Sequence, residues 1–138
     1  MTKNAYNWQK DVFQGSQSDI WNRMYEKVLY SNIVLEGLER NKGDIQDIQG
    51  ANDVKGQALF WRSYSFYQLA QFFCAVYDKE NLVGKIGLPL RLESDIDQKV
   101  GQSTLLQTYE QIVGDLLEAE DLLKNEKPSI FGTYFKSR

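Results

Sequence analysis

The stretch from Gly56 to Leu69, GQALFWRSYSFYQL, decides how this sequence can fold. It carries a heavy load of aromatic and aliphatic side chains and one charge, on Arg62. Its apolar residues recur at helical spacing, but they spread over more than one face. A helix that is apolar on several sides must be covered on several sides. We therefore expect this stretch to be the centre of an all-helical stack.

The central helix is predicted to run from about Asp53 to Val76, with Asn52 or Asp53 as its N-cap. Gly56 and several small residues along it would let neighbouring helices approach closely. Five polar side chains interrupt the apolar run from Ala58 to Tyr77, and each would be costly to expose to lipid. The stretch is therefore interpreted as a buried helix and not as a membrane span.

A helix is predicted on each side of the central one. The first runs from about Asp19 to Leu38, with Ser18 or Asp19 as its cap. Its inner face follows helical three- and four-residue steps through Trp21, Met24, Tyr25, Val28, Asn32, Leu35 and Leu38. The last helix runs from about Thr104 to Lys124 and begins with a capping-box pattern, Thr104 followed by Gln107.

The segment from Asp78 to Ser103 contains three glycines and a proline and is predicted to be a long irregular connection. Gly87 to Leu90 should be extended, because a residue before proline avoids the helical region. The first seventeen residues lack periodicity and are predicted to be loop or a short turn. The last residues, Phe131 to Arg138, look like the approach to a further helix, so we expect the chain to be part of a longer protein.

The composition is that of a folded domain or a piece of one: 138 residues, 42% hydrophobic and 25% charged. The net charge of −3 and the absence of a basic stripe argue against nucleic acid as a partner. The sequence has no histidine, the commonest general base and metal ligand. Its single cysteine, Cys74, lies in the aromatic run and is predicted to be a buried, inert thiol.

Three possible sites fail on inspection. Asp95 and Asp97 begin like a calcium loop, but the later glycine and glutamate positions are not filled. The glycines near Gly84 lack the Gly-Lys-Ser/Thr of a phosphate loop. Asp115 and Glu118 are helix neighbours that could suggest paired catalytic carboxylates, but both are predicted to face water. No metal, cofactor or catalytic residue is therefore predicted.

The order of these pieces resembles the N-terminal half of SusD/RagB-like proteins, the outer-membrane nutrient-binding lipoproteins of Bacteroidetes. The matching residues, in chain order, are Trp21, Tyr25, Asn32 and Leu35; Gln57 to Leu69 with Phe72, Phe73 and Tyr77; Gly87 to Leu90; and Ser103, Tyr109, Gln111 to Val113, Asp115, Leu116, Ala119, Leu122 and Leu123. The resemblance covers about Trp21 to Leu123. Ser63 departs from the alanine that is usual there, and the lipidated cysteine with its signal peptide is absent.

The resemblance implies an all-α, tetratricopeptide-like stack of antiparallel helices, with residues 1–138 forming one helical region of a larger SusD-like domain. It implies a non-catalytic protein of the cell surface and outer membrane. Such a protein captures glycans or other nutrients and works with a SusC-like TonB-dependent transporter.

Within this scheme most of the conspicuous residues are assigned to the core: Trp21, Tyr25, Asn32, Trp61, Arg62, Phe66, Leu69, Tyr109 and Leu116. Arg62 should pair with an acid or with helix-end carbonyls, because an unpaired buried charge is expensive. Asn32 should bond to a neighbouring helix or loop. Sugar stacking by Trp21 and Tyr25 is the less favoured alternative.

Trp8 and Tyr6 lie outside the helical stripes and are the candidate ligand-binding residues, because flat aromatic faces stack on sugar rings. The alternative for both is packing against the stack. The alternative function is a helical-repeat adaptor whose groove holds a protein or peptide partner. An enzyme has the least support.

Overall fold

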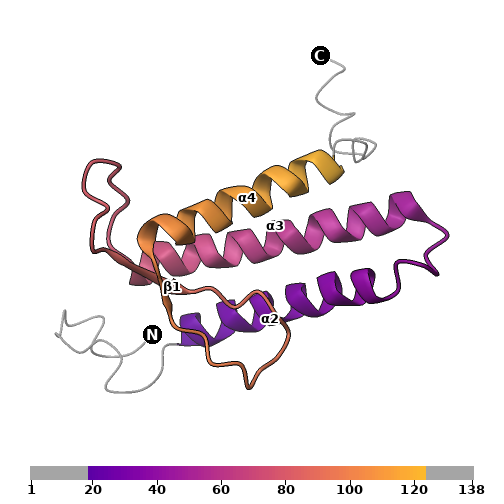
Figure 1. Ribbon diagram of the computed structural model, residues 1–138, viewed down its shortest axis with the longest axis horizontal. Helices are drawn as coiled ribbons and strands as arrows, with labels where there is room; N and C mark the ends of the chain where they lie inside the picture. The colour runs from indigo at the N-terminus through magenta and orange to yellow at the C-terminus, as the bar shows by residue number, and fades with distance from the viewer. Residues whose placement is uncertain (1–18, 124–138) are drawn as a thin grey trace, which may run out of the picture.

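The computed structural model describes residues 19–123, which form three long helices lying side by side (Figure 1). Helix α2 spans Asp19–Arg40, α3 spans Ile48–Phe73 and α4 spans Leu105–Leu123. Successive helices run antiparallel, and α3 lies between α2 and α4 and packs against both. The all-helical stack expected from the sequence is therefore confirmed.

The predicted bounds of the central helix were wrong at both ends. Helix α3 begins five residues before Asp53, because the side chain of Asp47 accepts a hydrogen bond from the Gly50 amide at 2.9 Å and caps the helix there. It ends at Phe73, and Cys74 is already extended (φ −107°, ψ 164°). Gly50 lies within the first turn, where a glycine is tolerated once a cap is in place.

The start of α4 agrees with the sequence. The Gln107 amide donates to the Thr104 hydroxyl at 3.1 Å, and the Thr104 amide donates to the Gln107 side chain at 2.9 Å. These reciprocal bonds are the predicted capping box.

The connection between α3 and α4 is more regular than predicted. Strand β1, Ile86–Pro89, pairs antiparallel with β2, Gln102–Thr104, in a two-stranded sheet. Gly87 allows β1 to approach the start of α4, because a side chain there would overlap the Thr104 carbonyl and the Thr108 hydroxyl. The Leu88 amide then donates to that hydroxyl at 3.0 Å, and Leu88 is buried.

The core lies where α2, α3, α4 and β1 meet, and it contains Val28, Phe66, Leu69, Ala70, Leu88 and Ile112. Trp21, Tyr25 and Tyr109 pack against this cluster and are half-buried. Asn32 and Arg62 are buried polar residues at the same level of the stack.

Two residues assigned to the core lie at the surface instead. Trp61 is 49% exposed and Leu116 is 39% exposed. Helix α3 has neighbours on two sides and β1 against part of its length, so one of its faces meets nothing else from residues 19–123.

The prediction that Cys74 is buried was also wrong, because Cys74 is only half-buried. This partial burial raises the pKa of its thiol. Among the described helices none has the length and apolar character required to cross a bilayer.

Candidate functional site

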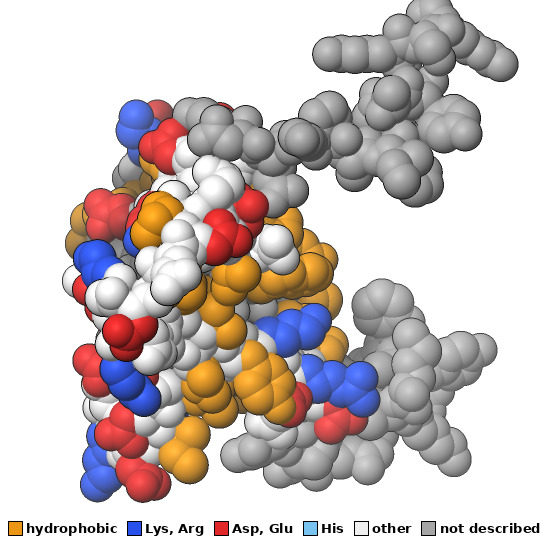
Figure 2. All heavy atoms as spheres, turned by 90° about the vertical axis from the view of Figure 1, so that its right-hand side faces the viewer, with side chains coloured by type: hydrophobic (Ala, Val, Ile, Leu, Met, Phe, Trp, Pro, Cys, Tyr) orange, Lys and Arg blue, Asp and Glu red, His pale blue; other side chains and the backbone are white. Residues whose placement is uncertain are grey.

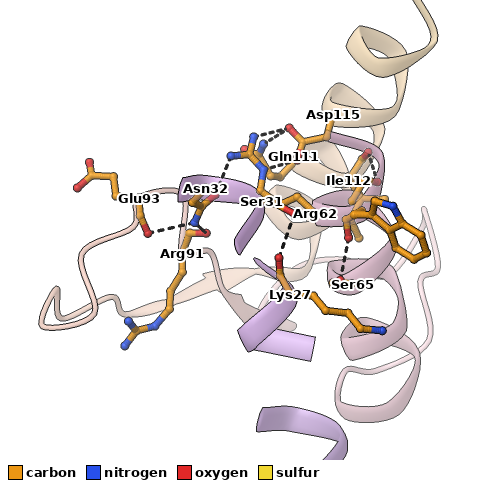
Figure 3. A network of polar contacts seen from close by, with 12 residues as sticks. Lys27, Ser31, Asn32, Arg62, Ser65, Arg91, Glu93, Gln111, Ile112 and Asp115 are labelled. Carbon is orange, nitrogen blue, oxygen red and sulfur yellow. Dashed lines mark hydrogen bonds and ion pairs between the residues drawn. The ribbon is translucent and has the colours of Figure 1, made fainter. Parts of the chain in front are cut away.

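A buried polar network joins the three helices at mid-height (Figure 3). Arg62, on α3, donates from Nε and Nη2 to the two carboxylate oxygens of Asp115, on α4, each at 2.8 Å. Its Nη1 donates to the side-chain oxygen of Asn32, on α2, at 3.0 Å. Arg62 is 9% exposed and Asp115 is 4% exposed, so the ion pair is shielded from water. Arg62 is paired with an acid, as the sequence predicted.

Asn32 links this network to the connection that follows β1. Its side-chain amide donates to the carbonyl oxygens of Arg91 and Glu93, both at 3.0 Å. Asn32 is fully buried, so these are the bonds that satisfy its donors. One side chain on α2 therefore fixes the path of a segment about sixty residues further along the chain.

The prediction that Asp115 faces water was wrong. It receives both guanidinium bonds and a third from the Gln111 side chain at 2.9 Å. Glu118, one turn on, does lie at the surface and pairs with Lys55. The two acids point to different partners, so they do not form the paired carboxylates of a catalytic site.

A cleft of about 460 Å³ lies between α2 and the connection that Asn32 holds. Its walls are formed from the α2 residues Trp21, Asn22, Tyr25, Glu26, Leu29 and Asn32, and from Pro89, Arg91, Glu93, Asp95, Ile96 and Val100 of the connection. We call it the α2 cleft. It combines aromatic surface with two amides, a guanidinium and three carboxylates.

The aromatic wall of the α2 cleft is firmly placed. The rings of Trp21 and Tyr25 are 4.8 Å apart, and Trp21 meets Phe73 edge-on at 5.1 Å. The Tyr25 hydroxyl donates to the Pro89 carbonyl at 2.8 Å, which joins the two walls. Burial raises the pKa of Tyr25, so its hydroxyl stays protonated and remains a donor.

The opposite wall is held by a second tie to α2. Glu36 accepts hydrogen bonds from the amide and the hydroxyl of Ser94, and these bonds lower the pKa of Glu36. The Arg91 guanidinium donates to the Ile96 carbonyl at 3.4 Å and has no ion pair with a carboxylate among residues 19–123. Its remaining donors are therefore available at the cleft.

The two candidate ligand-binding residues, Trp8 and Tyr6, lie outside the described residues. The α2 cleft itself was not predicted, because the sequence suggested Trp21 and Tyr25 chiefly as core and did not place the connection beside them. Within residues 19–123 no group of three or more metal-ligating side chains comes together.

A SusD-like family model, described as starch-binding and associating with the outer membrane, matches residues 1–137. The chain belongs to this SusD-like family. The match spans nearly the whole sequence, so it includes both the helical stack and the α2 cleft.

The SusD-like chain is also similar to a solved structure, a SusD superfamily protein from Bacteroides thetaiotaomicron VPI-5482, with a TM-score of 0.66 and 24% identity. The similarity covers 74% of this chain and 22% of that one, so the chain spans about a fifth of its structural relative. It establishes a shared fold. No match was found among curated proteins.

Proposed function

We propose that this SusD-like chain is one helical part of a larger SusD/RagB-like lipoprotein on the bacterial cell surface. The whole protein would capture oligosaccharides or related nutrients without catalysis and pass them to a SusC-like TonB-dependent transporter. The family description, starch-binding and associating with the outer membrane, supports the ligand class and the location.

The observation that carries the proposal in this part of the chain is the α2 cleft. A sugar ring offers a flat C–H face and a rim of hydroxyls, and Trp21 and Tyr25 supply the matching aromatic surface. Asn22, Arg91 and the cleft carboxylates supply donors and acceptors for the rim. A neutral polyhydroxylated ligand suits this mixture better than an apolar or strongly charged one.

The buried polar network beside the α2 cleft favours a binding function over a catalytic one. The carboxylate of Asp115 is occupied by Arg62 and Gln111, and it holds the scaffold. A rigid cleft lowers the entropy cost of binding, since its walls are already ordered before the ligand arrives.

Trp8 and Tyr6 remain proposed ligand contacts. Trp21, a wall residue of the α2 cleft, is the third residue of α2. Trp8 and Tyr6 precede this helix in the sequence.

The experiment is calorimetry of the full-length protein with a panel of starch-derived and other oligosaccharides and with peptides. Arg91→Ala, Asn22→Ala and Trp8→Ala should each weaken oligosaccharide binding about tenfold or more, the effect of one or two lost contacts. Lys42→Ala, at the far exposed end of the stack, is the matched control and should bind like wild type. Co-purification of a barrel transporter with the protein from membranes tests the proposed partnership.

The proposal is wrong if the full-length protein binds nothing in the panel and no barrel transporter co-purifies. The assignment of the binding site to the α2 cleft is wrong if oligosaccharides bind strongly and the two cleft variants, Arg91→Ala and Asn22→Ala, bind them as tightly as wild type does.

The second candidate function is a helical-repeat adaptor for a protein or peptide. A groove of about 420 Å³ between α2 and α3 favours it, with Tyr30, Val34, Val54 and Trp61 among its apolar walls. Binding of peptides but no oligosaccharides in the same panel, lost on Tyr30→Ala, would support this function over the first.

A further inference from the structure

The side-chain amide of Asn32 fits its surroundings in one orientation only. Its oxygen accepts a hydrogen bond from Arg62 Nη1, and its nitrogen donates to the carbonyl oxygens of Arg91 and Glu93, each at 3.0 Å. A guanidinium only donates and a carbonyl only accepts, so a flipped amide would set donor against donor and acceptor against acceptor. Asn32 is 0% exposed, so solvent does not compensate such a mismatch.

Arg62 is itself fixed from the side of α4. Its Nε and Nη2 donate to the two oxygens of Asp115, each at 2.8 Å, and Asp115 is held in turn by the Gln111 side chain. Because a guanidinium is planar and its donors are set at fixed angles, these two bonds also set the direction of Nη1. Figure 3 shows the resulting line of contacts, which runs from α4 through Arg62 and Asn32 to the connection after β1.

The peptide groups that Asn32 holds belong to two residues of the α2 cleft. The carbonyl oxygens of Arg91 and Glu93 accept from Asn32, and the side chains of the same two residues line the cleft. A rotation of either peptide group would therefore change where these side chains stand in the cleft.

Arg62 has two roles that can be separated. With Asp115 it neutralises a buried charge, and replacing both partners by apolar residues of similar size removes that requirement with little loss of stability. Its Nη1 also gives Asn32 the donor that orients the amide, and the same replacement takes this donor away. The second role therefore has a signature that stability alone does not have.

We propose that Arg62 is a positioning residue of the α2 cleft, acting through the Asn32 amide on the peptide groups of Arg91 and Glu93. The Nη1 bond keeps both amide hydrogens of Asn32 on the connection, so this wall of the cleft is in place before a ligand arrives. The effect on ligand affinity rests on the proposed function, whereas the effect on the wall is independent of any ligand.

Amide hydrogen exchange of the ligand-free, full-length protein tests the effect on the wall. The Arg91 amide donates to the Pro89 carbonyl and the Ser94 amide donates to Glu36, so both report on the connection. In Arg62→Met with Asp115→Leu, these two amides should exchange at least fivefold faster relative to the amide of Leu69, in the core of α3. Lys55→Ala, which breaks an exposed ion pair between α3 and α4, is the control and should leave the ratio unchanged.

A second background tests whether Arg62 acts through Asn32. Asn32→Ala should itself raise the exchange ratio at least fivefold, because it removes both donors to the connection. Adding Arg62→Met with Asp115→Leu to Asn32→Ala should raise the ratio no further. The ratio to Leu69 corrects for any general loss of stability in these variants.

Calorimetry with maltoheptaose, a starch-derived oligosaccharide, tests the effect on binding. Arg62→Met with Asp115→Leu should weaken the affinity at least fivefold although its urea midpoint is close to that of wild type. If wild-type protein does not bind maltoheptaose, the proposed function fails for this ligand, and the exchange ratios alone decide whether Arg62 positions the wall.

Three results would overturn the inference. An unchanged exchange ratio in Arg62→Met with Asp115→Leu would show that Arg62 does not position the wall. A further rise in the Asn32→Ala background would show that it acts by another route. Wild-type affinity for maltoheptaose in a variant whose wall exchanges faster would show that the position of this wall does not matter for binding.

Discussion

Arg62 and Asp115 are the charged side chains buried within residues 19–123, and they neutralise each other across α3 and α4. Burying an ion pair costs hydration, so such a pair adds little net stability but is strongly destabilising when one partner is removed. Its contribution here is geometric. With Asn32 it fixes the rotation of three helices and the position of the connection that forms the α2 cleft.

The first prediction concerns this pair. Arg62→Met or Asp115→Leu alone should lower the free energy of unfolding by about 3–5 kcal/mol, because each leaves a buried charge without its counter-ion. The double variant should recover much of that loss, since both charges are gone. Urea unfolding measures all three. Lys55→Ala, which breaks the exposed pair with Glu118, is the control and should cost under about 1 kcal/mol. Additive losses in the double variant would contradict the interpretation.

The second prediction concerns Glu36, whose pKa is lowered by its two hydrogen bonds from Ser94. A carboxyl whose pKa is lower in the folded state stabilises the fold fully above its unfolded pKa of about 4.3. That stabilisation is lost as the pH falls through the lower, folded pKa. The difference in melting temperature between wild type and Glu36→Gln should therefore be largest near neutral pH and shrink on acidification. In Ser94→Ala protein, the melting-temperature difference caused by Glu36→Gln should be smaller at neutral pH. A difference that grows in acid would show that the Glu36 carboxylate does not stabilise the fold in this way.

At the scale of the elements, close approach depends on glycines at two contacts. Gly56 lets the end of α4 lie against α3, and Gly87 lets β1 lie against the start of α4. The neighbours of Gly56 are side-chain atoms of Leu122 and Leu123, whereas those of Gly87 include the backbone of Thr104. Strand β1 therefore has less room to adjust than the α3–α4 contact.

The third prediction compares two glycine substitutions. Gly87→Ala should lower the free energy of unfolding by about 1–3 kcal/mol or more, because the added methyl overlaps the Thr104 carbonyl and displaces the Thr108 hydroxyl from the Leu88 amide. Gly114→Ala, within α4 and with open space around it, should raise it by about 0.5–1 kcal/mol. Thermal or urea unfolding of both variants measures these changes. A Gly87→Ala variant as stable as wild type would show that β1 can move away from α4.

For the whole molecule, the central helix has two kinds of surface. One side is buried against α2, α4 and β1, and the other carries the exposed rings of Phe60, Tyr64 and Tyr67, on the flank of the molecule where hydrophobic side chains gather (Figure 2). The sequence showed that α3 is apolar nearly all round, which means that every side needs a neighbour. The described residues provide neighbours for only part of it, which is why Trp61 and Leu116 lie at the surface.

The SusD-like membership gives this arrangement its context. The chain spans 22% of the solved relative, and the similarity between them is one of fold. Within residues 19–123 the α2 cleft is the candidate site, and the buried network lies beside it.

The sequence alone determined the local features: three helices in order, the capping box of α4, the extended stretch before Pro89 and the need of Arg62 for a partner. Each depends on residues within one or two turns of one another, so periodicity and capping chemistry suffice to predict it. Only the tertiary structure decided that the partner is Asp115, that Asn32 holds residues 91–93, that β1 pairs with β2 and that Trp21 and Tyr25 line a cleft. Those outcomes depend on how each helix is rotated about its axis. That rotation is set by the packing of residues that are far apart in the chain, as Tyr25 and Pro89 are, with 64 positions between their numbers.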